Sequence, residues 1–333
     1  MQVAWRPHSP VQRAALSRSQ APSEPLDLVE LGQGLMGVAT YGMHKARGIM
    51  ASRMRGGLAD RPAVLLERPF VMVQGFRSKV GGFRPLLDHL TKDGHNGGRP
   101  YYVKGGKVFS DPGCKQECQT PEPGAMVFRV VPHDRSQSPE DTASQLKEEF
   151  AAIRRFSGTQ LFDVAAHSMG GLGVRKYLDE NDDRLGRLMM GGTPHRGVRN
   201  ATDGYKVIAN RVGWAMALGG LAPAAAAALN WMRAENERPG ANPRLEDLNS
   251  RYAQQISKVE AAITVGSGDF STPAFAAGDR APGDGLVEQS SLYAPGGQVE
   301  LFSGGATKVH HCLFSDPDVF DRMVDFFRWK PQS

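Results

Sequence analysis

The amino-acid sequence predicts an α/β fold in which helices cover both faces of a mostly parallel central sheet, with a helical cap inserted. Three observations carry this prediction. Short apolar runs typical of buried parallel strands alternate with helical stretches along most of the chain. One of these runs leads through a small-x-Ser-x-Gly turn directly into a helix. At about residues 200–252 the alternation stops in an Ala- and Leu-rich stretch, as expected for a cap between two strands.

The composition is that of an ordinary globular protein. Of the 333 residues, 40% are hydrophobic and 23% are charged, which suits one large domain with insertions. No stretch of about 18 apolar residues is present, so we expect no transmembrane helix. Much of the net charge of +5 lies in residues 45–68, which either form a solvated basic face or attract an anionic membrane surface. No nucleic-acid-binding motif is present, so we expect no nucleic-acid partner.

Residues 1–25 are polar and Pro-rich, and we expect a disordered leader in front of a domain that spans residues 26–333. The leader lacks the apolar core of a secretory signal. The compartment therefore stays open, with the cytoplasm favoured over a secreted mature form. Residues 41–54 predict a basic amphipathic helix.

Residues 162–171, Phe-Asp-Val-Ala-Ala-His-Ser-Met-Gly-Gly, are the strongest catalytic signal in the chain. An apolar strand leads into the turn and residues 172–178 continue as a helix, so Ser168 stands at the strand tip as in a nucleophile elbow. Ala166 replaces the glycine usual two residues before the serine, and a methyl group is the smallest departure. The backbone N–H of Met169 opens the helix and is our first candidate oxyanion donor. An ordinary Gly-rich βα turn is the alternative.

A second oxyanion donor is expected where an early strand ends. Residues 69–76 are apolar up to the sequence Gln74-Gly75-Phe76. Gly75 lets the chain turn, and the backbone N–H of Phe76 is the candidate donor. A plain strand that ends in glycine is the alternative.

A serine hydroxyl needs a base, and the base needs an orienting acid. In serine hydrolases built this way, the chain order is serine, acid, histidine. Three aspartates follow a predicted strand at residues 261–266: Asp269, Asp279 and Asp284. We favour Asp284 as the acid, with a common Asp-Gly turn as the alternative.

Two adjacent histidines follow the last predicted strand, residues 298–302. They lie at the sheet edge expected for the serine, and we favour His310 over His311 as the base. Two further histidines, His167 inside the elbow and His195 after another strand, are expected to be structural.

Residues 92–123 are expected to form a Gly- and Pro-rich insertion. Its Cys114 and Cys118 form a small disulfide or stay free thiols, and a weak metal site with His89 and His95 is a third alternative. The paired spacing of a zinc site is missing, so we predict no metal and no cofactor.

Several stretches resemble the bacterial triacylglycerol lipase group of the α/β-hydrolase superfamily. They are residues 162–171, 191–197 (Gly-Gly-Thr-Pro-His-Arg-Gly), 284–287 (Asp-Gly-Leu-Val), 310–313 (His-x-x-Leu) and 315–319 (Ser-Asp-Pro-Asp-Val). The resemblance spans about residues 69–74 and 125–327. It implies an α/β-hydrolase fold, in which the Asp-Gly-x-Val pattern carries the acid and the His-x-x-Leu pattern carries the base.

This resemblance favours Asp284 and His310. One departure is Gln74, which stands where the family usually has a histidine that helps to order the oxyanion loop. Family members sometimes bind calcium through loop aspartates, but no such pair can be matched here.

These patterns predict a serine carboxylic ester hydrolase, lipase-like, that acts on acyl-ester or lipid substrates through a Ser-His-Asp triad and an acyl-enzyme. The cap, residues 200–252, is expected to shield an apolar acyl site, unless its helices merely extend the core. A phospholipase, polyester depolymerase or acyltransferase on the same machinery is an alternative, and so is a catalytically inactive binding protein. Transient contact with a lipid interface is a further expectation, and the oligomeric state stays open.

Overall fold

The computed structural model describes residues 43–51, 57–76, 83–121, 124–198, 228, 231–232, 242–272 and 281–332. The predicted leader lies outside this part of the chain, as does most of the predicted cap. The end of the cap is described and contains α7 (Pro243–Ser250). Residues 43–51 form a helix inside the range predicted for one.

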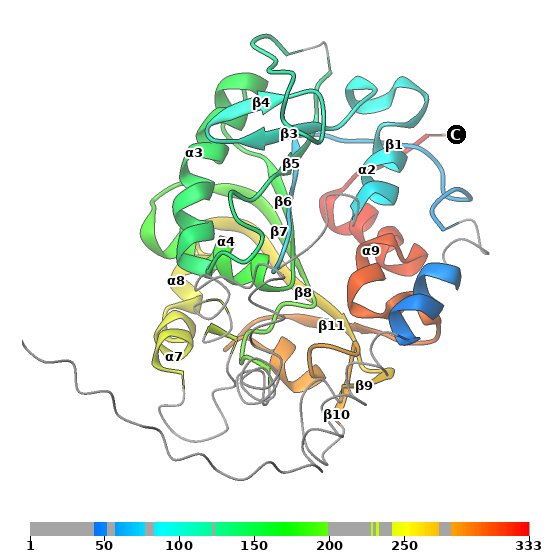
Figure 1. Ribbon diagram of the computed structural model, residues 1–333, viewed down its shortest axis with the longest axis vertical. Helices are drawn as coiled ribbons and strands as arrows, with labels where there is room; N and C mark the ends of the chain where they lie inside the picture. The colour runs from blue at the N-terminus through cyan, green and yellow to red at the C-terminus, as the bar shows by residue number, and fades with distance from the viewer. Residues whose placement is uncertain are drawn as a thin grey trace, which may run out of the picture.

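Within the part of the chain that the structure describes, an eight-stranded sheet organises the fold (Figure 1). Its strands, in spatial order, are β11 (Val299–Phe302), β8 (Val259–Ser267), β7 (Leu185–Gly191), β6 (Asp163–His167), β2 (Phe70–Val73), β5 (Val127–Val130), β3 (Tyr101–Lys104) and β4 (Lys107–Phe109). Neighbouring strands pair in parallel, except that β4 runs antiparallel to β3 at one edge. The predicted mostly parallel sheet of an α/β-hydrolase fold is thus confirmed.

Helices cover both faces of this sheet (Figure 1). One face carries α3 (Pro139–Ser157), α4 (Met169–Glu180) and α8 (Tyr252–Ile256), and the other carries α2 (Arg84–Leu90) and α9 (Pro317–Phe327). Successive strand residues point to opposite faces. Val164 and Ala166 of β6 therefore join the core under α3 and α4, whereas Ala165 joins the core under α2 and α9. A strand buried on both faces has little freedom to shift, which suits one that ends at the predicted catalytic turn.

The start of α3 shows how directly local sequence sets an element. Ser138 is the N-cap: its hydroxyl accepts the N–H of Asp141 at 3.2 Å, and the Asp141 carboxylate accepts the N–H of Ser138 at 3.1 Å. Pro139 occupies the first helical position, where its missing N–H costs nothing. Gly158 ends the helix with a φ of 71°. The predicted serine cap and proline start are both confirmed.

Residues 92–123 are more than a loop, which corrects the sequence-based prediction. A 3-10 helix η2 (Lys92–Gly97) is followed by β3 and β4, which extend the central sheet at one edge. Gly105 and Gly106 form the turn between these strands, with φ values of 61° and 68° that glycine adopts freely. The two strands are short and flanked by glycines, so their alternating pattern does not stand out in the sequence.

The remaining described elements are short. The Asp-rich segment contains β9 (Phe270–Thr272) and β10 (Ala281–Gly283), which pair antiparallel, and β12 (Lys330–Pro331) pairs with β1 (Val64–Leu65). Three 3-10 helices follow β10: η4 (Gln289–Leu292), η5 (Ala306–Lys308) and η6 (His310–Ser315). Over the described ranges, no helix is both long enough and apolar enough to cross a bilayer.

Candidate active site

Ser168 stands in the sharp turn between β6 and α4. Its backbone has a φ of 56° and a ψ of −135°, which non-glycine residues rarely adopt and which costs on the order of 1–3 kcal/mol. Its N–H donates to the carbonyl oxygen of Gly191 on β7 at 2.7 Å, so the sheet holds the strained residue in place. This is the geometry of a nucleophile elbow, which presents a hydroxyl at the carboxyl edge of the strands.

Glycines allow the elbow to pack closely on the end of β2. A Cβ atom at Gly75 would lie 2.7 Å from Ser168 Cβ, and one at Gly170 would lie 2.6 Å from the carbonyl oxygen of Gln74. Real Cβ atoms do not approach other heavy atoms that closely, so any larger residue would force the two segments apart. The segment after β2 is therefore fixed directly against the serine.

Asp284 and His310 are in direct contact, as the sequence predicts. His310 Nδ1 donates to Asp284 Oδ2 at 2.6 Å, and both side chains are buried. The other carboxylate oxygen, Oδ1, accepts the N–H groups of Leu286 and Val287 at 3.0 and 2.8 Å. A carboxylate oxygen at this position favours the tautomer in which Nδ1 carries the proton, and in a neutral ring that tautomer leaves the lone pair on Nε2. A histidine in this tautomer can take a proton from a hydroxyl.

The structure also brings this pair to the serine. A Cβ atom at Gly192, next to the residue that binds Ser168 N–H, would lie 2.8 Å from His310 Nδ1. On the other side, His167 Nε2 donates to the carbonyl oxygen of His310 at 2.8 Å. A hydrogen bond between Ser168 Oγ and His310 Nε2 is not formed within the described residues. Such bonds often tighten only when substrate binds.

The two predicted oxyanion donors border one small cavity. Met169 is the first residue of α4, and Phe76 follows the glycine that touches the serine. A cavity of about 10 Å³ is lined by both residues, together with Gly75 and Gly170. That volume is about the size of a single water-sized atom group. The two candidate donors thus lie at one small space on the side of the elbow that faces the end of β2.

Arg129, a buried residue on β5 that no sequence motif singled out, anchors the segment that follows β2. Its guanidinium donates to Gln74 Oε1 and lies over the Phe83 ring, 5.6 Å from the centroid. Burial lowers the pKa of Arg129 to about 10, so the side chain stays positively charged at neutral pH. A single arginine inside an otherwise apolar strand is the signal that could have revealed it. The Gln74 side chain is thus held by a cation, where the resemblance leads one to expect a histidine.

Two other histidines, His195 and His311, are poor bases. His195 accepts a hydrogen bond from Arg175 at Nδ1 and donates from Nε2 to the Thr264 hydroxyl, each at 2.9 Å. Burial and the neighbouring arginine hold its pKa well below the usual value, so it stays neutral. Burial and His310 lower the pKa of His311 to about 3, which makes it a weak base. The preference for His310 over His311 therefore has a physical reason.

Of the two rival aspartates, Asp269 belongs to the part of the chain that the structure describes. Asp269 accepts the N–H of Gly304 at 2.5 Å. Asp279 lies outside the described residues. The contact that orients His310 comes from Asp284.

Cys114 and Cys118, the two cysteines of the insertion, are free thiols and form no disulfide with each other. Among the residues that the structure describes, no group of three His, Cys, Asp or Glu side chains is arranged to hold a metal ion.

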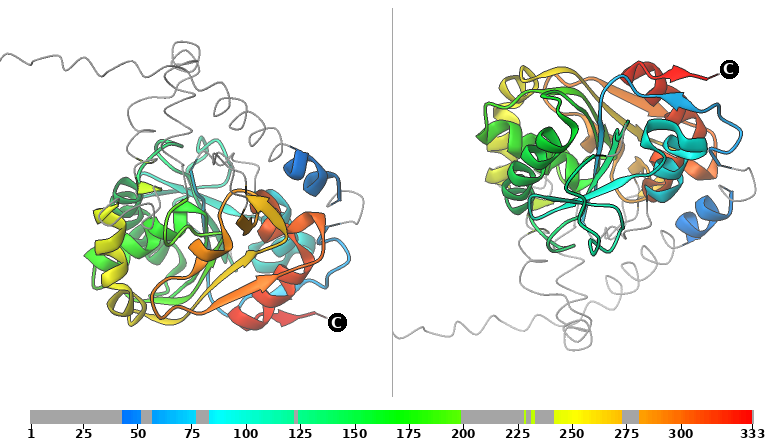
Figure 2. Two further views of the ribbon diagram at one scale, coloured as in Figure 1. Left: turned by 90° about the horizontal axis from the view of Figure 1, so that it is seen from below. Right: turned by 90° about the horizontal axis from the view of Figure 1, so that it is seen from above.

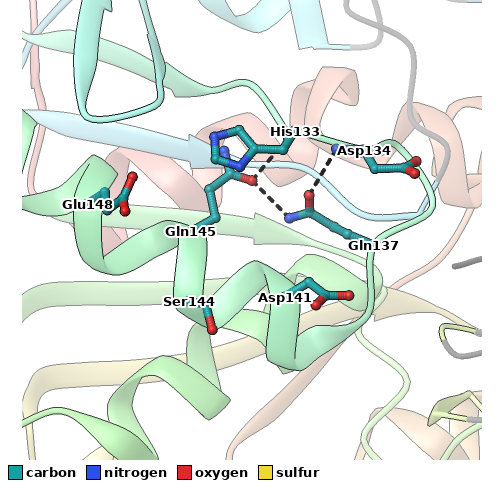
Figure 3. Close-up of a pocket in the computed structure, with 7 residues that line it drawn as sticks. All are labelled: His133, Asp134, Gln137, Asp141, Ser144, Gln145 and Glu148. Carbon is teal, nitrogen blue, oxygen red and sulfur yellow. Dashed lines mark hydrogen bonds between the residues drawn. The ribbon is translucent and has the colours of Figure 1, made fainter.

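A groove of about 370 Å³ that is lined by polar residues lies beside this small cavity, at the start of α3 (Figure 3). Gln137 and Asp134 line both cavities. Gln145 holds the groove together, because its Oε1 accepts the His133 N–H at 3.2 Å and the Gln137 side-chain amide at 2.9 Å. Its lining residues all have polar side chains, unlike those of the apolar cluster around Met169.

No family model matches the chain, and neither does any of the curated proteins searched. Solved structures do resemble it. The product of the gene lin2722 from Listeria innocua matches with a TM-score of 0.52 and 16% identity, over 78% of this chain and 93% of that one. At this identity the likeness supports the fold alone.

Two further matches have lower scores. The mature form of the Bacillus licheniformis lipase BlEst2 has a TM-score of 0.49 and 14% identity, over 80% of this chain and 93% of that one. The carboxylesterase CesB from Bacillus subtilis has a TM-score of 0.41 and 12% identity, over 89% of this chain and 98% of that one. What the chain does must therefore be argued from its own site.

Proposed function

We propose that the chain is a serine carboxylic ester hydrolase with Ser168 as nucleophile, His310 as general base and Asp284 as the orienting acid. The observation that carries this proposal is the buried 2.6 Å hydrogen bond between His310 and Asp284, at the sheet edge where the strained serine stands. A serine hydroxyl is a weak nucleophile at neutral pH and needs such a base.

In the proposed reaction, His310 Nε2 takes the hydroxyl proton as Ser168 Oγ attacks the ester carbonyl carbon. Asp284 stabilises the imidazolium that results and keeps its ring in place. The backbone N–H groups of Met169 and Phe76 receive the oxyanion of the tetrahedral intermediate. His310 then protonates the leaving alcohol, and an acyl-enzyme remains. Water then attacks the acyl-enzyme while His310 takes its proton. His310 returns that proton to Ser168 Oγ as the carboxylic acid product leaves.

A lipase-like preference for apolar acyl groups is supported by the surroundings of the elbow. Met169 and Leu172 of α4 belong to an apolar cluster with Trp231 and Leu245, and Phe76 packs against it. The tryptophan comes from the range predicted to form the cap. An apolar wall beside the oxyanion cavity would hold an acyl chain and keep water from the acyl-enzyme.

The test is hydrolysis of a p-nitrophenyl ester series, from acetate to palmitate, by the wild type and by Ser168→Ala. We expect the variant to lose about 10⁴-fold or more in kcat. The chain-length optimum then separates an esterase from a lipase. Wild-type protein that hydrolyses no ester, or a variant that keeps its rate, would overturn the mechanism.

The alternative of an inactive binding protein is tested by a fluorophosphonate probe, which labels activated serines. We expect the probe to label the wild type and to leave both Ser168→Ala and heat-unfolded protein unlabelled. Absence of labelling in folded wild type would favour the binding protein.

A further inference from the structure

Residues 43–51 form a short helix at the rim of the molecule, shown in blue in Figure 2. Helical residues advance by about 100° each, so residues three and four apart share a face. Four residues are partly or fully buried: His44, Gly48 and Ala51 form the inner face, and Lys45 lies at its edge. The opposite, exposed face consists of four apolar residues: Met43, Ala46, Ile49 and Met50.

The inner face rests on the segment that leads to His310. A Cβ atom at Gly48 would lie 2.6 Å from Val309 Cγ1 and 2.7 Å from the carbonyl oxygen of Ala306. The His44 ring packs edge-on against Phe270, with centroids 5.2 Å apart. The helix is therefore seated on the active-site side of the fold, next to the proposed base.

The outer face is unusually apolar for a surface. Met43 and Met50 are 61% and 62% exposed, and Ile49 is 39% exposed. Three of the six large hydrophobic side chains that are most exposed among the described residues thus lie on this one helix. Single exposed apolar residues are ordinary, but a group of them marks a surface that binds something.

Positive charges border this apolar ridge on both sides. Lys45 and Arg47 fall at the two edges of the outer face, because they lie about 100° on either side of Ala46. The surrounding sequence strengthens the charge: residues 31–59 contain no Asp or Glu and carry four cations, Lys45, Arg47, Arg53 and Arg55. An apolar ridge between cations matches a bilayer surface, in which acyl chains lie below anionic phosphates. A ridge that stands out from the fold fits a flat surface better than it fits a groove.

We propose that the helix of residues 43–51 docks on the anionic surface of a phospholipid bilayer, with Met43, Ile49 and Met50 entering the headgroup region. Lys45 and Arg47 would meet the lipid phosphates. The role of this docking rests on the proposed ester hydrolysis. Docking would turn the side of the fold that carries His310 towards a lipid substrate.

The test is cosedimentation of the full chain with vesicles, which measures binding without catalysis. We expect binding to phosphatidylcholine vesicles that contain phosphatidylglycerol, and much weaker binding to phosphatidylcholine alone. Met43→Ser/Met50→Ser should lower the partition coefficient at least about 10-fold, and Arg47→Glu about 5-fold or more. Raising the salt concentration should weaken wild-type binding, since surface charge is screened within about 10 Å at 0.1 M.

A matched control is Leu65→Ser/Leu301→Ser, which removes two other exposed aliphatic side chains, on β1 and β11. It should bind vesicles as the wild type does. Equal binding by all variants, or no binding to either vesicle type, would overturn the proposal. The proposal would also be overturned if the wild type were a dimer and Met43→Ser/Met50→Ser were a monomer that binds vesicles as the wild type does. A second copy of the chain would then be what covers the helix.

Catalysis and docking can fail separately. Ser168→Ala should still sediment with anionic vesicles although it hydrolyses no ester. A wild type that binds vesicles but cleaves no ester would refute the proposed hydrolase and leave the docking surface standing.

Discussion

Replacing Asp284 with asparagine tests the proposed triad through a single atom. Oδ1 of Asp284 accepts two loop N–H groups, from Leu286 and Val287, and Oδ2 accepts His310 Nδ1–H. An asparagine can put its carbonyl oxygen on only one of these sides. If the oxygen faced the histidine, the two loop N–H groups would face an amide NH₂ and stay unsatisfied, at about 1–3 kcal/mol each. The oxygen should therefore stay with the loop.

The NH₂ group of the introduced asparagine would then point at His310 Nδ1. Two donors cannot bond each other, so the ring must accept at Nδ1 and carry its proton on Nε2. A histidine in that tautomer cannot take the Ser168 proton. We expect kcat to fall by about 10⁴-fold, which corresponds to roughly 5 kcal/mol of transition-state stabilisation. KM should change little, because the substrate does not touch Asp284.

The assay is the initial rate on a soluble short-chain p-nitrophenyl ester, with circular dichroism to show that the variant is folded. Asp269→Asn is the matched control, because this rival aspartate bonds a loop N–H and no histidine within the described residues. It should keep the wild-type rate. A fall of less than about 10-fold in kcat for Asp284→Asn, below about 1.4 kcal/mol, would refute the assignment of the acid.

Three further predictions follow from the contacts. Gly75→Ala should lower kcat by about 10²-fold with little change in KM. The new Cβ atom would lie 2.7 Å from Ser168 Cβ and would push the proposed oxyanion loop away. Steady-state kinetics measures both constants, and an unchanged kcat would contradict the prediction. Arg129→Met should lower kcat and the melting temperature together, because Gln74 loses the guanidinium that holds it; a stable variant with full activity would argue against that anchor. Burial raises the pKa of Asp163 to about 6, above its unfolded value of about 3.9, so the folded state holds the extra proton between these pH values. The free energy of unfolding should therefore fall by up to about 3 kcal/mol as the pH rises from about 4 to about 6; urea titrations should show a flatter profile for Asp163→Asn, and equal slopes would contradict the shift.

The predictable parts of the fold are those that short stretches of sequence determine. The elbow could be predicted because strand, turn and helix follow each other within residues 162–178. The start of α3 could be predicted because Ser138 and Asp141 cap each other three residues apart. The positions of Ser168 and His310 could also be predicted, since they follow β6 and β11 of the central sheet, whereas Asp284 follows β10 of the small β9–β10 pair.

The parts that could not be predicted depend on contacts between distant segments. Arg129 matters because of Gln74 and Phe83, which lie far from it in sequence. The strand order, in which β5 and β3 lie on one side of β2 and β6 lies on the other, is not encoded in any local pattern. The β3–β4 hairpin was missed because strands of four and three residues show too few alternations to be recognised.

The glycines of the site show most clearly that contacts between distant segments cannot be predicted from local sequence. The chain has 39 glycines, and pattern alone cannot say which of them must be glycine. The structure separates them: a Cβ at Gly75 would strike Ser168, and one at Gly192 would strike the His310 and Asp284 pair. Gly192 also has a φ of 59°, which larger residues rarely adopt. Two glycines more than a hundred residues apart thus let the chain pack closely around the proposed nucleophile and the proposed base, and only the folded chain brings them together.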